Sequence, residues 1–128
     1  MSEPESFSIQ KRIKSFTYAF KGIILLVKRE HNARIHLVAL VGVIIAGLIL
    51  RIGIYEWMAV VFASGLVFMA ELFNTAIEKL ADEVDPKWNA RIGQVKDYAA
   101  GAVLVSALVA MIVGALVFLP RIMAILWK

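Results

Sequence analysis

Three long apolar segments constrain this 128-residue chain more than any other feature of its sequence. They cover residues 37–50, 57–70 and 99–119. A bilayer core about 30 Å thick is crossed by about 20 mainly apolar helical residues. The third segment has that length, and the other two reach it when residues 34–36 and 71–77 are included. Hydrophobic residues make up 61% of the sequence, above the roughly 45–50% that is usual in soluble domains. The sequence therefore predicts an all-α integral membrane protein with three transmembrane helices.

Basic residues predict how these spans are oriented. Of the 14 Lys and Arg residues, seven precede the first span and four lie between the second and the third. By the positive-inside rule both segments are cytoplasmic, whereas the turn at residues 51–56 and the C-terminus face outward. The net charge is +4, and the basic residues flank the apolar spans, so they are better suited to a membrane surface than to binding a nucleic acid. The absence of cysteine excludes disulfides and thiolate metal sites.

A further helix is predicted before the first span, because apolar residues recur there at steps of four and three. These residues are Ile9, Ile13, Phe16, Phe20, Ile23 and Val27. Basic residues on the opposite side favour a helix that lies in the membrane interface; packing on the protein's own core is a compatible alternative. The chain is thus predicted as one domain, residues 1–128, with a surface helix at about 8–28 and membrane helices at about 33–52, 56–83 and 95–120.

Small residues follow one another at four-residue spacing along the third span. They are Ala102, Ser106, Ala110 and Gly114. Such a stripe allows helices to approach closely in a membrane. We interpret it as a packing surface and not as a chemical site.

The second span carries polar groups on one face. At 100° per residue, these five side chains share a face: Glu71, Asn74, Thr75, Glu78 and Asp82. Ionisable residues inside a membrane are costly and usually functional. A structural ion pair is the alternative, but the nearest basic residue of this helix, Lys79, lies off the polar face. The pattern therefore favours a functional site.

Two further polar groups flank the other spans at the same membrane surface. They are Glu30, Asn32, Arg34 and His36 before the first span, and Lys96 with Asp97 at the start of the third. Carboxylate and amide oxygens suit a hard cation such as Mg²⁺, with phosphate oxygens completing its shell. Neighbouring Lys and Arg would stabilise phosphate charge. The common phosphate-binding loop and hydrolase motifs are absent. Composition and periodicity alone thus reach a three-span protein with a carboxylate-rich cytoplasmic site.

Two longer motifs at fixed separation add a family resemblance. Residues 71–78 (ELFNTAIE) and 96–103 (KDYAAGAV) closely resemble the small prokaryotic diacylglycerol kinase and undecaprenol kinase family, and the resemblance covers nearly the whole chain. It implies a homotrimer of three-span subunits with amphipathic surface helices, in the bacterial inner membrane. Active sites shared between neighbours on the cytoplasmic side would transfer the γ-phosphate of ATP, with Mg²⁺, to the hydroxyl of a membrane lipid.

The resemblance also implies residue roles. Glu71 would be the general base that takes the proton of the lipid hydroxyl, and Glu30 and Glu78 would bind the metal. The nucleotide would contact Lys11, Tyr18, Glu30, Asn74, Glu78, Lys96 and Asp97. The lipid would contact Ser15, Asn32, Arg34, His36, Trp57 and Glu71. Lys11 stands where the family usually has arginine, which weakens any bidentate phosphate contact there. The loop Lys87, Trp88 and Asn89 takes a place where the family touches nucleotide, although its sequence matches poorly.

The identity of the lipid remains open between undecaprenol and diacylglycerol. The form of residues 74–78 and 99–103, Trp57, and the ending at Arg121 resemble the undecaprenol kinases more.

A non-enzymatic trimer, either ion-conducting or accessory, is the main alternative function. A conducting pathway should continue across the bilayer, but beyond Glu71 the spans offer only the hydroxyls of Ser64 and Ser106. This one-sided arrangement favours an enzyme at the interface.

Overall fold

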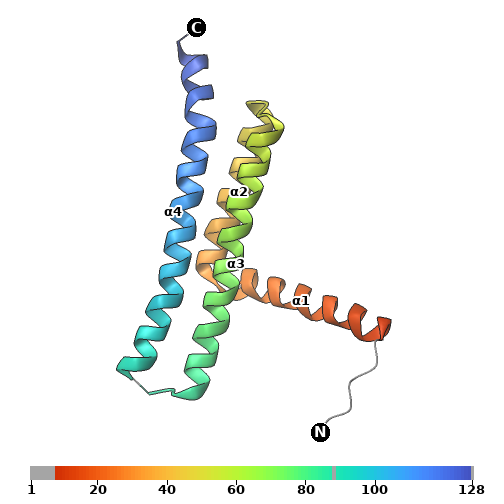
Figure 1. Cartoon of the computed structure of the whole chain (residues 1–128), viewed down its shortest axis with the longest axis vertical. Helices are drawn as coiled ribbons and strands as arrows, with labels where there is room; N and C mark the ends of the chain where they lie inside the picture. The colour runs from red at the N-terminus through yellow and green to blue at the C-terminus, as the bar shows by residue number, and fades with distance from the viewer. Residues whose placement is uncertain (1–7, 88, 128) are drawn as a thin grey trace.

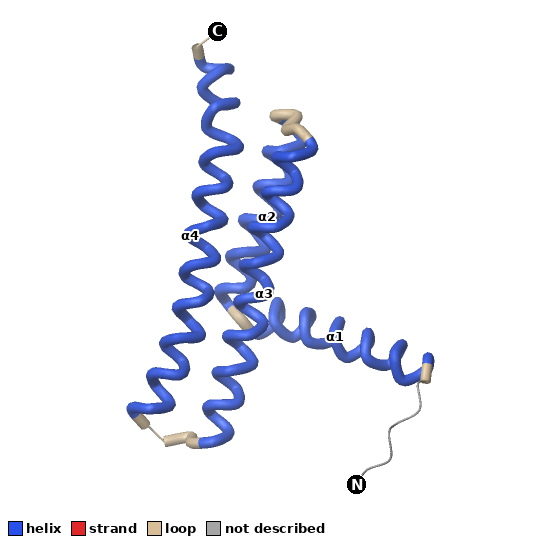
Figure 2. Tube along the Cα trace, viewed as in Figure 1, coloured by secondary structure: helices blue, strands red, loops and turns tan. Residues whose placement is uncertain are grey.

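Four helices make up the part of the chain that the computed structural model describes, residues 8–87 and 89–127. They are α1 (Ile9–Arg29), α2 (His31–Ile49), α3 (Ile54–Val84) and α4 (Ala90–Leu126). Helices α2, α3 and α4 run side by side, and α1 projects sideways (Figures 1 and 2). The last three are long and apolar enough to cross a membrane. This confirms the predicted all-helical membrane protein with three spanning helices.

The lengths of the helices locate the bilayer along the bundle. At 1.5 Å per residue α2 is about 28 Å long, close to the bilayer core of about 30 Å, whereas α3 and α4 are about 46 and 55 Å long. We call the end with the α2–α3 turn (residues 50–53) the turn end, and the end with the α3–α4 loop (residues 85–89) the loop end. Helix α1 leaves the bundle partway along α3 and α4, so their loop ends project beyond it (Figure 1).

Helix α4 extends beyond both ends of the predicted range 95–120. It starts at Ala90 because the side chain of Asn89 accepts a hydrogen bond from the amide of Arg91, which caps the first turn. It also continues through Pro120 to Leu126. Proline has no amide hydrogen to donate, but spanning helices tolerate such interruptions when neighbouring groups satisfy the freed carbonyl.

The turn end holds the hydrophobic core. Ile52, Val60 and Val117 are buried there, and Trp57 packs against them. The chain reverses at Arg51, whose φ of 50° is left-handed. Backbone hydrogen bonds from Ile52 to Gly47 (3.1 Å) and from Arg51 to Leu48 (3.3 Å) close the end of α2, in the pattern of a Schellman motif. The reversal places α3 against α2.

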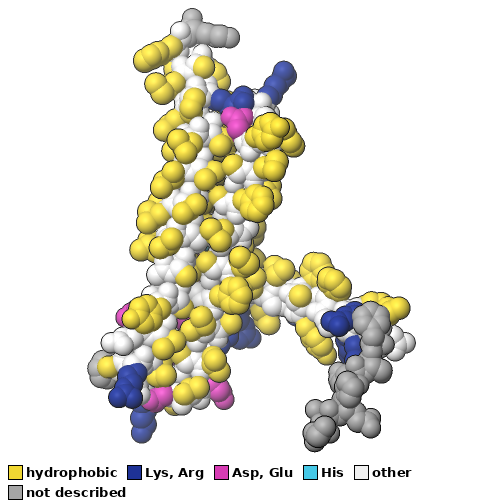
Figure 3. Space-filling view, in the orientation of Figure 1, with side chains coloured by type: hydrophobic (Ala, Val, Ile, Leu, Met, Phe, Trp, Pro, Cys, Tyr) yellow, Lys and Arg dark blue, Asp and Glu magenta, His cyan; other side chains and the backbone are white. Residues whose placement is uncertain are grey.

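The outside of the bundle is hydrophobic between two charged ends (Figure 3). Large apolar side chains such as Phe62 and Leu116 are 76% and 72% exposed. Soluble proteins rarely expose apolar patches of this extent. The surface between the charged ends therefore suits contact with lipid or with other membrane helices.

Most of the apolar face of α1 is not covered by the rest of the described chain. Leu26, near the end that joins α2, is buried. Ile13, Phe16 and Phe20 are each more than 60% exposed. Packing on the protein's own core thus accounts only for the last turns of α1.

Candidate functional site

A single residue, Glu30, joins α1 to α2. Its extended backbone ends one helix and begins the next, and its amide donates to the carbonyl of Leu26 at 2.8 Å. Its carboxylate accepts a hydrogen bond from Nζ of Lys79 at 3.3 Å. A carboxylate at the start of a helix is also favoured by the helix dipole. Glu30 is therefore fixed against α3 although 49 residues separate it from Lys79.

Glu71 is the most deeply buried charged side chain among the described residues, with 2% of its surface exposed. The Nε2 atom of His36 on α2 lies 3.2 Å from its Oε1 atom. That distance allows charge attraction when the imidazole is protonated, and Oε1 accepts no hydrogen bond from the described groups. Glu78 and Glu30 are near enough for their charges to act on Glu71. Three carboxylates thus share one region.

Asn74 connects the deep and shallow parts of the α3 polar face. Its Nδ2 donates to Oε1 of Glu78 at 3.2 Å, and its own Oδ1 is buried without a partner in the described chain. Glu71, Asn74 and Thr75 are buried, Glu78 is half-buried and Asp82 is exposed. The predicted polar face is therefore turned into the chain where it is deepest and opens toward the loop end.

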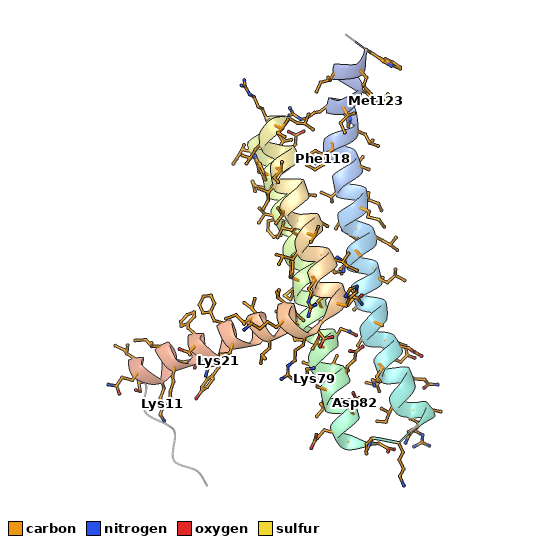
Figure 4. The ribbon with its side chains drawn as sticks, turned by 180° about the vertical axis from the view of Figure 1, so that it is seen from behind. Lys11, Lys21, Lys79, Asp82, Phe118 and Met123 are labelled. Atoms are coloured by element: carbon orange, nitrogen blue, oxygen red, sulfur yellow. The ribbon has the colours of Figure 1, made fainter. Side chains whose placement is uncertain are left out.

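Helix α4 contributes Lys96 but not Asp97. Lys96 donates to Oδ1 of Asp82 at 2.6 Å, which places its ammonium beside the α3 polar face. Asp97 is exposed, because neighbouring residues of a helix point about 100° apart. Figure 4 shows Asp82 and Lys79 on the part of α3 that extends past α1.

The described chain does not bring three predicted residues of α1, Lys11, Ser15 and Tyr18, to the carboxylates. Lys11 lies at the far end of α1 (Figure 4), roughly 28 Å from Glu30 by helical rise. The hydroxyl of Ser15 donates to the carbonyl of Lys11 at 3.0 Å. Nζ of Lys21 lies 5.8 Å from the ring centre of Tyr18. All three side chains are exposed within the chain.

Arg34 stabilises the junction between α1 and α2. Its Nε donates to the carbonyl of Val27 at 3.0 Å, and its Nη2 donates to the carbonyl of Lys28. It thereby satisfies carbonyls in the last turn of α1, a common role for arginine at a helix end. Asn32 is exposed in the first turn of α2.

Trp57 and the α3–α4 loop lie away from Glu71. Trp57 belongs to the core at the turn end, about 21 Å from Glu71 along α3 by helical rise. In the loop, the Asp85 carboxylate accepts bonds from the amide of Lys87 at 3.1 Å and from the side chain of Asn89 at 3.0 Å. Trp88 lies outside the described residues.

An apolar cavity of about 350 Å³ lies between α2, α3 and α4. His36 lines it, together with Val67 and Phe68, which stand one turn before Glu71. The α4 wall includes Ala107, Ala110 and Gly114, so small residues leave space here. The four residues of the predicted packing stripe therefore lie in different environments. Ser106 is buried, Ala110 and Gly114 border the cavity, and Ala102 is exposed.

The side chains at this site could supply some, but not all, of the ligands of a Mg²⁺ ion. Among the described residues, no three His, Asp or Glu side chains form a complete metal site. Glu30, Glu78 and the unpaired Oδ1 of Asn74 nevertheless offer the oxygen atoms that a hard cation prefers. Mg²⁺ commonly binds one or two carboxylates and completes its shell with water and phosphate oxygens. The residues present fit that mode of binding.

Sequence reasoning missed the side chains that pair with these carboxylates. Lys79, His36 and Lys96 each face an acidic residue outside their own helix. Helical periodicity relates residues of one helix only, so it could not reveal pairs across helices. The partner that the α3 pattern seemed to lack is, for Glu71, the imidazole of His36 on α2, which forms an ion pair only when it is protonated.

Comparison with known proteins places the chain in a family. Residues 17–118 match the family described as prokaryotic diacylglycerol kinase. A protein of Bacillus subtilis named undecaprenol kinase is 38% identical over 114 residues, which are 89% of this chain and 93% of that protein. A protein of Synechocystis named diacylglycerol kinase is 35% identical over 113 residues, 88% of this chain and 65% of that longer protein. The chain therefore belongs to the prokaryotic diacylglycerol kinase family and is a lipid kinase.

Proposed function

We propose that this chain transfers the γ-phosphate of Mg·ATP to the hydroxyl of a membrane lipid. The observation that carries the proposal is the position of Glu71. This buried carboxylate stands between an apolar cavity that suits hydrocarbon and a polar cluster of Glu78, Asn74 and Lys96 that suits a charged nucleotide. A lipid hydroxyl and a phosphate would meet at such a boundary.

The depth of the two α3 carboxylates supports a division of roles. Glu71 and Glu78 are about 10 Å apart along the helix, too far to bind one metal directly. Glu71 would accept the proton of the lipid hydroxyl as its oxygen bonds to the γ-phosphorus, while the bond from that phosphorus to ADP breaks. Glu30 and Glu78 would hold Mg²⁺. When bound, that ion neutralises charge on the phosphate oxygens.

Nucleotide binding in this proposal needs more than one chain. Lys11 and Tyr18 are proposed nucleotide contacts, yet both belong to α1, which projects away from the bundle within one subunit (Figure 1). A homotrimer in which α1 of one subunit reaches the carboxylates of its neighbour would complete the site. Asn74, Lys96 and Asp97 would be the other nucleotide contacts. The uncovered apolar side of α1 supports its placement in the membrane interface.

We assign the site to the cytoplasmic side of the bacterial inner membrane. The basic residues of α1 and those in and around the α3–α4 loop support this orientation by the positive-inside rule. ATP is available on that side, and the loop ends of α3 and α4 would project into it.

Undecaprenol is the lipid we propose first, with diacylglycerol as the alternative. The sequence features around residues 74–78 and the name of the Bacillus relative both support it. Ser15, Asn32, Arg34, His36 and Trp57 remain proposed lipid contacts, and a long polyprenol could reach as far as Trp57. A non-enzymatic polar pathway gains no support, because Ser64 is the only polar residue besides His36 that lines the cavity in the described chain.

The test is phosphate transfer by purified chain in mixed micelles with γ-labelled ATP. Undecaprenol, diacylglycerol and a hydroxyl-free lipid of similar length would be compared with and without Mg²⁺. We expect labelled lipid only with a hydroxyl acceptor and Mg²⁺, and faster labelling of undecaprenol. Hydrolysis of ATP without labelled lipid would contradict the proposal, and faster labelling of diacylglycerol would reverse the substrate order.

A further inference from the structure

We infer that His36 relays the proton that Glu71 takes from the lipid hydroxyl to water at the membrane surface. The inference rests on the proposed function, since it assigns the next step to the same site. It gives His36 a positioning and relay role through Glu71, beyond a contact with lipid.

The first argument is the contrast in exposure between the two side chains. The side chain of Glu71 is 2% exposed, whereas that of His36 is 24% exposed. A base that is closed off from water keeps its proton unless a neighbouring group can accept it. His36 is that neighbour, because its Nε2 atom lies 3.2 Å from Oε1 of Glu71. Imidazole also changes protonation state readily near neutral pH.

The second argument concerns the other charged groups around the pair. Two further carboxyl groups interact electrostatically with Glu71, Glu78 from α3 and Glu30 from the α1–α2 junction. The α4 wall of the cavity beside His36 consists of uncharged residues. Arg34, on the same helix as His36, donates to carbonyls of α1, and Lys79 is paired with Glu30. In the described chain His36 is therefore the titratable group placed to exchange a proton with Glu71.

The relay keeps protons in balance. Phosphoryl transfer leaves one proton on the carboxyl group of Glu71. That proton passes from Oε1 to Nε2 of His36, which restores the Glu71 carboxylate and leaves a cationic imidazolium. The imidazolium then releases a proton from its other ring nitrogen to water. That release leaves the ring hydrogen on Nε2, so exchange of this hydrogen from Nε2 to Nδ1 through water restores the starting tautomer of His36 before the next transfer. The Glu71 carboxylate is already restored, and no other reactant is consumed.

Burst kinetics with His36→Ala test the relay. At a lipid concentration that saturates the variant, one phosphorylated lipid per site should form at near the wild-type rate, because Glu71 still accepts the first proton. Later turnovers should slow by about tenfold or more, since proton removal is impaired. Added imidazole should restore the later turnovers in proportion to its concentration. His31→Gln, at an exposed histidine five residues earlier on α2, is the matched control and should behave as wild type.

His36→Gln separates relay from packing. Glutamine fills the space and can hydrogen-bond to Glu71, but it cannot carry a proton, so it should show the same burst followed by slow turnover. Wild-type turnover in His36→Gln, or equal slowing of the first and later turnovers in His36→Ala, would overturn the inference. Retained Mg·ATP binding would show that the variants are folded. Failure of the proposed function is distinct, because wild-type chain would then label no lipid.

Discussion

Arg121 and Glu56 form a two-pronged ion pair that joins α4 to the start of α3 at the turn end. Nε of Arg121 donates to Oε1 of Glu56 at 3.1 Å, and Nη2 donates to Oε2. Nη1 donates at 3.2 Å to the carbonyls of Leu50 and Arg51. Glu56 in turn accepts a bond from the amide of Gly53, so one carboxylate caps α3 and holds Arg121.

Removing this pair should loosen the turn end without touching the proposed chemistry. Glu56→Ala leaves the Gly53 amide and the Arg121 guanidinium without their acceptor, so we expect the protein to unfold at a lower temperature in detergent. Arg121→Lys should fall between it and wild type, because an ammonium cannot make the paired contacts of a guanidinium. Unfolding followed by helical circular dichroism measures both variants. An unchanged transition in Glu56→Ala would show that the pair does not stabilise the bundle.

Gly47 should tolerate no side chain. A Cβ atom there would stand 2.7 Å from Cη2 of Trp57 and 3.1 Å from Cδ1 of Ile52. Gly47→Ala should therefore destabilise the chain by about 1–3 kcal/mol. Gly42→Ala lies on the same helix with nothing within 4 Å of its Cβ, so it should be neutral or slightly stabilising. Unfolding in a denaturing detergent compares the two, and equal stabilities would refute the close contact.

Ala110→Leu tests whether the cavity holds lipid hydrocarbon. Ala110 borders the cavity, and a leucine would occupy part of its space. We expect weaker lipid binding, seen as a raised KM for lipid, with the KM for Mg·ATP unchanged. Ala102→Leu is the control, since Ala102 belongs to the same stripe but is exposed. The reverse pattern, with Ala102→Leu impaired and Ala110→Leu normal, would place the stripe's functional contact on the outer surface, as in a trimer interface.

The dependence of activity on Mg²⁺ concentration should change when either of two carboxylates is replaced, but not when a third is replaced. Glu30→Gln and Glu78→Gln each remove a proposed Mg²⁺ ligand, so activity should fall steeply and require more Mg²⁺. Glu83→Gln changes an exposed carboxylate of the same helix and should leave the Mg²⁺ titration unchanged. Rates measured across Mg²⁺ concentrations decide the matter. Wild-type titrations in both ligand variants would remove Glu30 and Glu78 from the metal site.

The sequence predicted the parts of this molecule that depend on a single helix. Apolar runs identified three spans, and the 100° periodicity placed Glu71 and Asn74 on a face that the structure shows buried. Contacts between different helices could not be predicted from the sequence. The Glu71–His36 and Glu30–Lys79 pairs depend on how α2 packs against α3, and the role of Arg34 depends on the bend at Glu30. Likewise, the small-residue stripe indicated packing but not the cavity beside Ala110.

The most direct measurement of the central claim is lipid phosphorylation by Glu71→Gln beside wild type, with Mg·ATP binding titrated on the same samples. Glutamine has nearly the same shape as glutamate but cannot accept the hydroxyl proton, so turnover should fall by at least about a hundredfold. Mg·ATP binding should remain within a few-fold of wild type, because Glu71 lies deeper than the proposed nucleotide contacts. Near-wild-type turnover in Glu71→Gln would contradict the account, whatever its effect on binding.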